Sequence, residues 1–551
     1  GQIWDLFKTE PSLDSQKFST RFEDLLKIFN TSLAVDKAEQ EQVKSALTEL
    51  KHNRKPAAAF CAEQTCVDIL QNLDEWANNH SEKLFWLYGV AGMGKSTIAA
   101  TVSNRLNAQK LLGGYHICSR DSTTHQSPTQ LVLNLCYQLA LVYKPFGRQA
   151  AKAIRATNLF TPNDMHITEL FDQLLIQPLT TIYKQQQKPT TMITLVIDAL
   201  DECGTPEERH IVVQKLEQLV GCCDWIKVLI TSRPTVDVQK CLAKEKAREW
   251  SLDPMNNDSN IEQFFQLKFQ QNSEFEDDLN MLLKAIPALA KQAGGLFIWA
   301  KIAYEYLQLN LDKLMALEKL LQKETFNDLH FLYKTVLKEA IPSQNKEIYQ
   351  VVMGAILLAG EPLSEKGLGR LLAVQNGLKE SIVATVVSRL KALIYVGSDK
   401  KLYIMHPSLR EYLTDSQVES EFSIGQEQHY TLFEKTVSVM EQQLKFNICE
   451  LESSYETNSE VKDLEERIKC HISEELQYSA RYWMYHMVKS GEWSSNHDRA
   501  LKKFGSSNIL LYWIEILSVL GCVRKSMLEL TKVMQWMKVS RISEQTVCNI
   551  S

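Results

Sequence analysis

The stretch Leu84-Phe-Trp-Leu-Tyr-Gly-Val-Ala-Gly-Met-Gly-Lys-Ser-Thr97 decides the fold of this chain. Its second part, Gly89–Thr97, matches the pattern GxxxxGK[ST] and directly follows an apolar run of strand type. The next residues, Ser96 to Leu106, have helical spacing. A glycine-rich loop between a strand and a helix lets several backbone N–H groups point at one anion. The sequence therefore predicts a phosphate-binding loop.

The residue types of this loop fit a nucleotide with Mg²⁺. Lys95 is expected to reach the β- and γ-phosphates, and the Ser96 hydroxyl is expected to ligate the metal. The alternative is a plain glycine turn before a helix. The residues expected to contact the nucleotide here are Gly89, Val90, Ala91, Gly92, Met93, Gly94, Lys95, Ser96 and Thr97.

A second apolar run, Met192–Ile197, ends in acidic residues. Asp198 would stand at the tip of a strand beside the phosphate loop, where an acid that binds Mg²⁺ belongs. Asp201 and Glu202 follow within one turn, and either can polarise an attacking water; we favour Glu202 as the general base. Without the loop upstream, the same pattern would also suit a solvated cap.

A third apolar run, Lys227–Ser232, precedes Arg233. A guanidinium at a strand end can sense or neutralise a γ-phosphate, so Arg233 is the third candidate catalytic residue. The competing interpretation is an ordinary arginine in a surface ion pair.

Beyond these motifs, the pattern of periods predicts a multidomain α/β plus α fold. Apolar strands that alternate with amphipathic helices indicate a parallel sheet covered on both faces. Past Ser251 helical periods dominate, apart from two short β-type runs, Ala392–Val396 and Leu402–Met405. A hairpin after three helices is typical of a winged helix. The strands expected besides those above are Leu84–Tyr88, Gly114–Cys118 and Ile226–Thr231.

Composition excludes several classes of protein. Of the 551 residues, 44% are hydrophobic and 23% charged, which excludes wholesale disorder. A net charge of −6 gives no global attraction to nucleic acid or to an anionic membrane. Twelve cysteines are too dilute for a disulfide scaffold, and we expect buried, reduced thiols. No leader or bilayer-length apolar run is found, so we expect a cytoplasmic protein, while a first residue other than Met suggests a fragment.

Taken together, the motifs Gly89–Thr97, Val196–Glu202 and Ile230–Arg233 are similar to the NACHT branch of the STAND NTPases, a group of switch ATPases that includes the NOD-like receptors. Within that branch, the chain most resembles the fungal proteins. The resemblance covers about residues 60 to 540. Downstream stretches that also resemble the family are Gly294–Ala300, Ile404–Leu413, Ala480–Trp483 and Asn508–Ser518.

The resemblance adds two residues to the expected site. His406 looks like the winged-helix histidine that holds the ADP β-phosphate, although a histidine after a hairpin strand is more often structural. Pro254 is expected to contact the base. Two positions depart from the family: Phe297 stands where relatives often carry proline, and Cys66 stands where arginine is usual. The sequence therefore leaves open whether the site prefers adenine or guanine.

The resemblance implies a nucleotide-dependent signalling switch in innate immunity or programmed cell death. The ADP form would be closed, ATP–Mg²⁺ would open the chain and drive self-association, and slow hydrolysis would reset it. An unidentified ligand or protein would activate it, and nucleic acid is not expected. The implied parts are an N-terminal helical region (1–55), a NACHT domain (56–252), a helical domain (253–325), a winged helix (326–415) and a C-terminal helical domain (416–551).

Two other functions stay open on the sequence. One is an ATPase of the AAA+ type that acts on nucleic acid through a winged helix. The acidic balance and the mixed charges of residues 379–391 argue against it. The other is a non-catalytic scaffold in which the nucleotide is structural.

Overall fold

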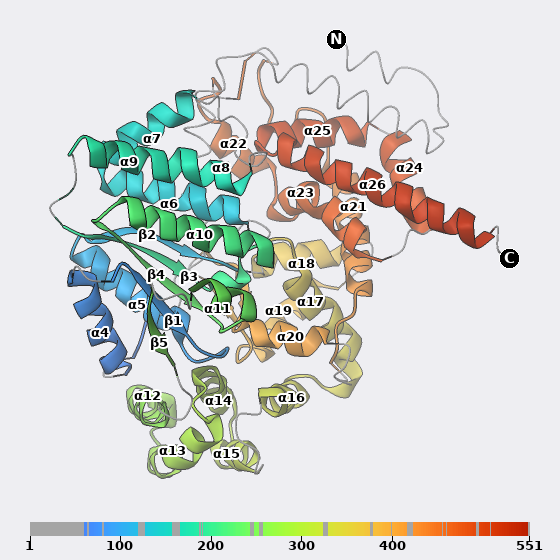
Figure 1. Cartoon of the computed structure of the whole chain (residues 1–551). Helices are drawn as coiled ribbons and strands as arrows, with labels where there is room; N and C mark the ends of the chain where they lie inside the picture. Colours follow the sequence, from blue (N-terminus) through green and yellow to red (C-terminus); the bar gives the residue numbers. More distant parts are fainter. Residues whose placement is uncertain are drawn as a thin grey trace.

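The computed structural model describes residues 60–62, 65–79, 82–119, 127–156, 166–186, 189, 191–242, 247–252, 257–322, 329–374, 378–397, 399–415, 422–453, 456–458, 460–491, 495–506 and 508–548. The helices expected in residues 1–55, and Pro254, lie outside these ranges. An α/β part comes first in the described chain, and a helical part follows it (Figure 1). None of the helices in these ranges has the length and apolar character needed to cross a bilayer.

A parallel sheet is the centre of the α/β part, as the sequence predicts. Its strands lie in the order β2-β3-β4-β1-β5, and every neighbouring pair is parallel. Because β4 lies between β1 and β3, the carboxyl ends of these three strands meet at one edge of the sheet. The strands are β1 (Leu84–Tyr88), β2 (Leu112–Ile117), β3 (Ile193–Asp198), β4 (Ile226–Ser232) and β5 (Ala247–Ser251).

Helices cover both faces of this sheet, and this explains why its central strands β1, β3 and β4 are mainly apolar and buried. In β1, Leu84 and Trp86 pack on the face covered by α6 and α8–α10, whereas Phe85 and Leu87 pack on the face of α4 and α5. The helical elements of this part are α4 (Val67–Asn78), α5 (Lys95–Ala108), α6 (Pro128–Val142), α7 (Lys144–Ala156), α8 (Ile167–Phe171), the π-helical turn η2 (Asp172–Ile176), α9 (Gln177–Lys184), η3 (Leu200–Glu202), α10 (Pro206–Cys222) and α11 (Val236–Leu242).

The helical part begins with α12 and runs to the end of the described chain. Helices α12–α15 form one group in Figure 1, while α17–α20 and α21–α26 lie further along the side of the α/β part. Its elements are α12 (Asp258–Gln271), η5 (Ser273–Phe275), α13 (Leu279–Ala293), α14 (Phe297–Leu309), α15 (Lys313–Leu321), α16 (Leu329–Ala340), η6 (Ser343–Asn345), α17 (Lys346–Leu358), α18 (Glu365–Ala373), α19 (Glu380–Arg389), β6 (Ile394–Val396), β7 (Leu402–Ile404), α20 (Pro407–Thr414), α21 (Glu427–Gln443), α22 (Leu464–His471), α23 (Glu474–Lys489), α24 (Ser495–Ser506), α25 (Ile509–Val519) and α26 (Val523–Cys548).

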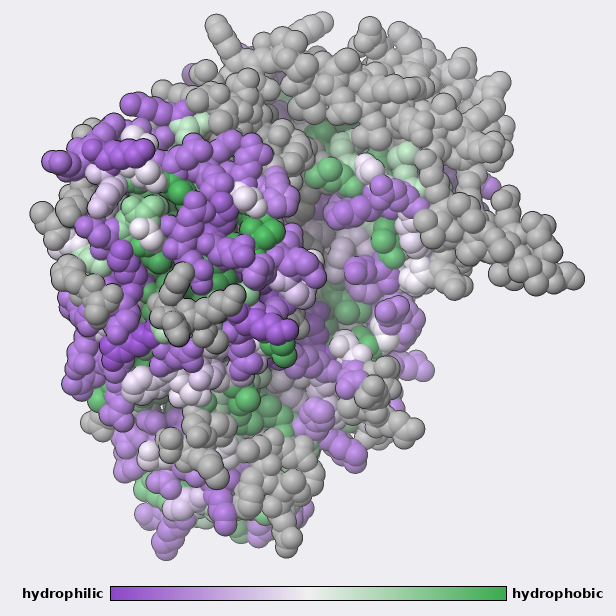
Figure 2. Space-filling view, in the orientation of Figure 1, coloured by the Kyte–Doolittle hydropathy of each residue, from purple (hydrophilic) through white to green (hydrophobic). Residues whose placement is uncertain are grey.

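One continuous apolar core runs through the helical part, from Ile261 in α12 to Met537 in α26. It includes one residue of the phosphate loop, Met93, whose exposed fraction is 1%. Figure 2 shows that the coloured part of the visible surface is mainly hydrophilic, with smaller hydrophobic areas among the hydrophilic residues. Because Met93 belongs to this core, the phosphate loop of the α/β part is packed against the helical part.

The hairpin predicted around residues 398–401 is present as the antiparallel pair β6 and β7, with Tyr395 opposite Tyr403. Helices α17, α18 and α19 precede it and α20 follows it. The sequence did not indicate β5, which pairs with β1 at the edge of the sheet. Its residues Ala-Arg-Glu-Trp-Ser include two adjacent charged side chains and are mostly half-buried, so they lack the apolar run that marked the central strands.

Candidate functional site

The phosphate loop connects β1 to α5 and is held in a left-handed backbone conformation at two glycines. Gly92 has φ 84° and Gly94 has φ 90°, values that favour glycine over any residue with a side chain. Gly94 is also the residue that caps α5, so the first N–H groups of this helix point out at the loop. The backbone therefore presents an anion-binding concavity where the sequence predicts one.

Lys95 lies folded over this loop. Its Nζ donates to the carbonyl oxygens of Gly89 and Val90, each at 2.7 Å. Burial lowers the pKa of Lys95 to about 8, although Asp201 and Asp198 act in the opposite direction. The ammonium group is thus partly desolvated and near two carboxylates, and a phosphate group beside it would stabilise its charged form.

Asp198 ends β3 as expected, and its side chain is fully buried. Thr231 in the neighbouring strand β4 donates its hydroxyl to Asp198 Oδ1 at 2.5 Å. The same hydroxyl accepts from the Ala199 N–H at 3.0 Å. Thr231 therefore fixes the carboxylate and the start of the turn after it. Sequence reasoning did not assign this threonine a role, although it lies in the quoted strand.

Asp201 and Glu202 form the short turn η3 immediately beyond β3, and both are buried. The N–H of Arg233 donates to Asp201 Oδ1 at 2.9 Å, and its Nε lies 3.4 Å from Asp201 Oδ2. The ends of β3 and β4 are therefore joined through these two residues. The two carboxylates and the guanidinium occupy the edge of the sheet where the loop begins.

Arg233 has a second carboxylate partner in the helical part. Its Nη1 donates to Glu411 Oε1 at 2.9 Å, and Glu411 belongs to α20. Burial acts to lower the pKa of Arg233, but Glu411 and Asp201 outweigh burial and the pKa is raised. The ion pair that the sequence left as the competing interpretation is therefore present, and it connects two parts of the chain.

His406 is the N-cap residue of α20, the helix that carries Glu411. Its Nδ1 accepts from the Ser408 N–H at 3.2 Å and lies 2.7 Å from Ser408 Oγ. The hydroxyl of Tyr333 in α16 lies 2.7 Å from the same Oγ. The imidazole is thus oriented by its own helix, one turn before the glutamate that reaches Arg233.

Helix α14 begins directly against the phosphate loop. The N–H of Ile298 donates to Gly92 O at 3.1 Å. A Cβ added to Gly92 would overlap Ile298 Cγ2, so a glycine is required there by its φ value and by this contact. The motif Gly294–Ala300 was noted in the sequence, but nothing in its residues showed that it packs on the loop.

The structure brings together most of the residues that the sequence selected. Lys95 interacts electrostatically with Asp198, Asp201, Glu202 and Arg233. Ser96 and Thr97 open α5, where Thr97 O accepts from Thr101 Oγ1. Val90, Ala91 and Met93 complete the loop. His406 stands on the helix that contacts Arg233, and Pro254 lies outside the described residues.

The residues present suit Mg²⁺ with a nucleotide. Mg²⁺ prefers one or two carboxylate or hydroxyl oxygens together with phosphate oxygens and water, instead of a cage built by the protein alone. Asp198, oriented by Thr231, and Ser96 at the start of α5 offer oxygens of this kind. In the described part of the chain, no group of three or more His, Cys, Asp or Glu side chains is arranged to hold a metal ion.

A parallel sheet with a glycine-rich loop and lysine after one strand, and a buried aspartate at the end of another, defines a P-loop NTPase fold. In agreement, the family model described as Nephrocystin 3, N-terminal matches residues 64–233. A comparison with curated proteins finds no match.

Several solved structures are similar to this chain at low identity. The Walker-type ATPase of Pyrococcus abyssi is 16% identical over 64% of this chain and 98% of its own, with a TM-score of 0.34. A STAND protein with a tetratricopeptide repeat sensor from Pyrococcus horikoshii is 14% identical over 90% of this chain and 67% of its own, with a TM-score of 0.41. Cdc6p of Pyrobaculum aerophilum is 12% identical over 64% and 94%, with a TM-score of 0.28.

Proposed function

We propose that this chain is a nucleotide-dependent switch. The loop Gly89–Thr97 holds the phosphates of ADP or ATP, with Ser96 and Asp198 as ligands of Mg²⁺. Lys95 neutralises the β- and γ-phosphates. The left-handed loop glycines, the partly desolvated lysine and the fixed aspartate support this assignment.

The contact between Arg233 and Glu411 is the observation that carries the switching role. Arg233 lies at the sheet edge near Lys95, and Glu411 lies in the helical part. A γ-phosphate beside Lys95 competes with Glu411 for the guanidinium, whereas ADP does not. ATP therefore weakens a bond that holds α20 against the α/β part, and its differential affinity for the two arrangements shifts their populations.

His406 couples binding of the diphosphate to the position of α20, the helix that carries Glu411. Because its Nδ1 is engaged at the cap of α20, the ring would donate to a phosphate through Nε2. ADP then holds α20 in place. We divide the chain into a NACHT domain (56–252), a helical domain (253–325), a winged helix (326–415), which contains α20, and a C-terminal helical domain (416–551). Release of α20 exposes surfaces for self-association.

Hydrolysis resets the switch slowly. Glu202 orients the attacking water, with Asp201 holding Arg233 nearby, as their position just beyond Asp198 supports. The resemblance to NACHT proteins assigns such a switch to innate immunity or programmed cell death.

The test is to identify the nucleotide bound to the purified protein, and then to measure the mass of the protein in solution with ADP and with ATP–Mg²⁺. We expect ADP in a monomer, and a larger species with ATP–Mg²⁺. His406→Asn keeps a side chain able to cap α20 but removes the imidazole, so it should lose ADP faster and assemble more readily.

His330→Ala is the matched control, because this histidine of α16 contacts Tyr412 of α20 with 5.0 Å between the centroids of the two tilted rings. It should leave ADP retention unchanged. Unchanged retention and mass in His406→Asn would remove the histidine from the mechanism. A chain that binds neither nucleotide would overturn the proposed function as a whole.

A further inference from the structure

Two cysteines lie just before α4, on either side of two hydrogen-bonded residues, Ala62 and Thr65, which we call the Ala62–Thr65 turn. The Thr65 N–H donates to Ala62 O at 3.1 Å, and the Thr65 hydroxyl donates to the same oxygen at 2.7 Å. A turn closed in this way brings its first and last residues close together. Cys61 and Cys66 are the residues directly outside it, and their side chains interact with one another.

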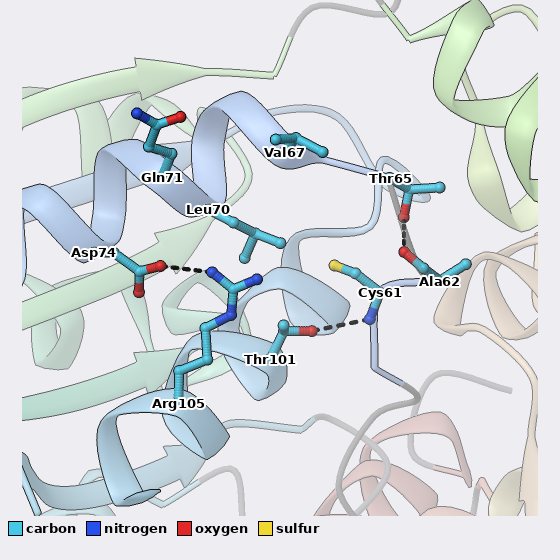
Figure 3. A pocket seen from close by; sticks show the side chains of 9 residues that line it. All are labelled: Cys61, Ala62, Thr65, Val67, Leu70, Gln71, Asp74, Thr101 and Arg105. Carbon is cyan, nitrogen blue, oxygen red and sulfur yellow. Dashed lines mark hydrogen bonds and ion pairs between the residues drawn. The ribbon is translucent and has the colours of Figure 1, made fainter. Parts of the chain in front are cut away.

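A cavity of about 320 Å³ gives small molecules a path to this turn. Figure 3 shows the Cys61 side chain among the residues that line it, with Leu70 of α4 on one side and Arg105 of α5 on another. Arg105 is paired with Asp74 across the cavity at 2.5 Å. Cys61 is therefore partly shielded, but it is open to a reagent of the size of a peroxide.

The two thiols differ in ionisation. The hydrogen bond from Cys66 lowers the pKa of Cys61 to about 7, against the effect of burial, and Thr101 and Arg105 contribute in the same direction. The hydrogen bond to Cys61, together with burial, raises the pKa of Cys66. At neutral pH, Cys61 is thus the partner with thiolate character, and Cys66 stays a thiol.

We propose that Cys61 and Cys66 form a dithiol site that hydroperoxides oxidise to a disulfide. The Cys61 thiolate attacks one oxygen of the peroxide, the O–O bond breaks, and hydroxide (an alkoxide from an organic peroxide) leaves. The resulting Cys61 sulfenic acid is attacked by the Cys66 sulfur, which forms the S–S bond and releases water. The peroxide is reduced and the two sulfurs are oxidised.

Hydrogen bonds link this turn to both sides of the phosphate loop. The Cys61 N–H donates to Thr101 Oγ1 at 2.9 Å, and Thr101 Oγ1 donates to Thr97 O at 2.8 Å. The Cys61 end of the turn is therefore hydrogen-bonded to α5, about one helical turn after Thr97, the residue that ends the loop.

The Cys66 end of the turn is hydrogen-bonded to the helical part. The Cys66 N–H donates to Asn260 Oδ1 at 2.9 Å, and Asn260 in turn donates to Asn257. Asn257 Nδ2 donates to Gly295 O at 2.9 Å, just before α14. Cys66 itself has φ 56°, a left-handed value that is unusual for a residue with a side chain. Resting on the proposed function, oxidation at this turn changes the rate at which nucleotide leaves the loop.

The experiment exposes the full chain to hydrogen peroxide, digests it with trypsin without reduction and maps the peptides by mass. Both cysteines fall in the tryptic peptide 55–83, which contains no other cysteine, so the disulfide appears as a loss of two hydrogens from that peptide. We expect this product, reversed by dithiothreitol. In Cys66→Ser, dimedone should trap a sulfenic acid on Cys61. In Cys61→Ser, it should label Cys66 several-fold less.

Cys222→Ser is the control for another close pair, Cys222 and Cys223, whose sulfurs lie 3.7 Å apart on adjacent residues. It should leave oxidation of peptide 55–83 unchanged. The rate of alkylation of Cys61 by iodoacetamide should rise with a midpoint near pH 7, because the pKa of this thiol is lowered to about 7. Cys66→Ala removes the hydrogen bond from the Cys66 thiol and should move that midpoint upward.

Absence of the disulfide, or equal dimedone labelling of Cys61 and Cys66 in the two variants, would overturn the site. Release of a fluorescent ADP analogue from oxidised and reduced protein then tests the link to the loop. Equal release rates would remove that link and leave the dithiol site standing. A chain that binds no nucleotide would fail the proposed function alone, because the peptide result does not depend on it.

Discussion

Arg233 Nη1 and Glu411 Oε1 lie 2.9 Å apart, although 178 residues separate the two side chains in the sequence. The same guanidinium contacts Asp201, which lies in the turn after β3 on the other side. Arg233 is therefore bound at once to the α/β part and to α20. Any ligand that takes over one of these two contacts also changes how firmly α20 is held.

The first prediction concerns Glu411→Gln. Without this carboxylate, no charge on α20 competes with a γ-phosphate for Arg233, so the affinity for ATP should rise relative to that for ADP. Glu411 is half exposed, and such a pair is worth at most about 1 kcal/mol, so the ratio should change by about twofold to fivefold. Calorimetric titration with both nucleotides measures it. Glu380→Gln, which removes an exposed partner of Arg370, should not change the ratio.

The second prediction concerns the proton on Lys95. Its pKa of about 8 should rise when a phosphate binds beside it, so nucleotide binding at pH 8 should take up about half a proton. Titrations in buffers of different ionisation enthalpy measure this uptake. It should vanish near pH 6, where the lysine is already protonated. Uptake that does not depend on pH would assign the proton to another group.

Lys95→Met should have opposite effects on nucleotide binding, which it removes, and on the stability of the fold, which it raises near neutral pH. A lysine whose pKa is lowered by folding binds fewer protons in the native state than in the unfolded state between pH 8 and its ordinary pKa of 10.5. Its cost to stability is therefore present in full below pH 8 and fades as the pH rises toward 10.5. We expect Lys95→Met to lose nucleotide binding. Its melting temperature relative to the unsubstituted chain should be most favourable near pH 7.

The third prediction compares two glycines of the loop. Gly92→Ala and Gly94→Ala both place a side chain at a left-handed φ, which costs about 1 kcal/mol. Only at Gly92 would the new methyl group overlap Ile298; at Gly94 the nearest atom is Phe297 Cδ2 at 3.5 Å. Gly92→Ala should therefore cost about 1–3 kcal/mol more. Denaturant unfolding measures both, and in an Ile298→Ala background, which removes Cγ2 but keeps Cβ, the difference should become smaller.

The fourth prediction concerns two buried histidines in the helical part. His429 Nδ1 lies 2.9 Å from His486 Nδ1, and the Nε2 of His486 lies 2.6 Å from the Tyr478 hydroxyl. Burial, with Lys489 and Arg410 nearby, lowers the pKa of His429 to about 4, and burial together with His429 holds the pKa of His486 well below its ordinary value.

Because the unfolded state binds more protons below the ordinary histidine pKa of 6.5, the free energy of unfolding should fall as the pH drops from 6.5 toward 4. Melting curves over this range measure the slope. His429→Gln should flatten it, since one of the two titrating groups is gone. A slope near zero in the unsubstituted chain would mean that the histidines are protonated in the folded state.

The parts of the site that sequence reasoning placed are those made by neighbouring residues. The loop Gly89–Thr97 and the strand that ends in Asp198 follow from local pattern, because residue type and period are enough to fix them. Glu411, Ile298 and Thr231 could not be found in this way. Each acquires its role from a contact with another element, and a single sequence contains no signal for that contact.

Arg233 shows where a local pattern is ambiguous. Its place after an apolar run is equally typical of a phosphate sensor and of an ion-paired surface arginine, and the choice depends on what faces it. In the fold, the strand β5 was missed for a related reason. Its neighbour β1 supplies the backbone partners, while its own side chains carry the charges of an edge.

Met93 has a consequence for any shortened form of this protein. Its thioether is 1% exposed only because α14 and its neighbours cover it. A polypeptide that stopped at β5 would present this methionine to water and would lose the Ile298 bond to the loop backbone. Nucleotide affinities measured on such a fragment would therefore describe a loosened loop, and would not transfer to a chain that carries its helices.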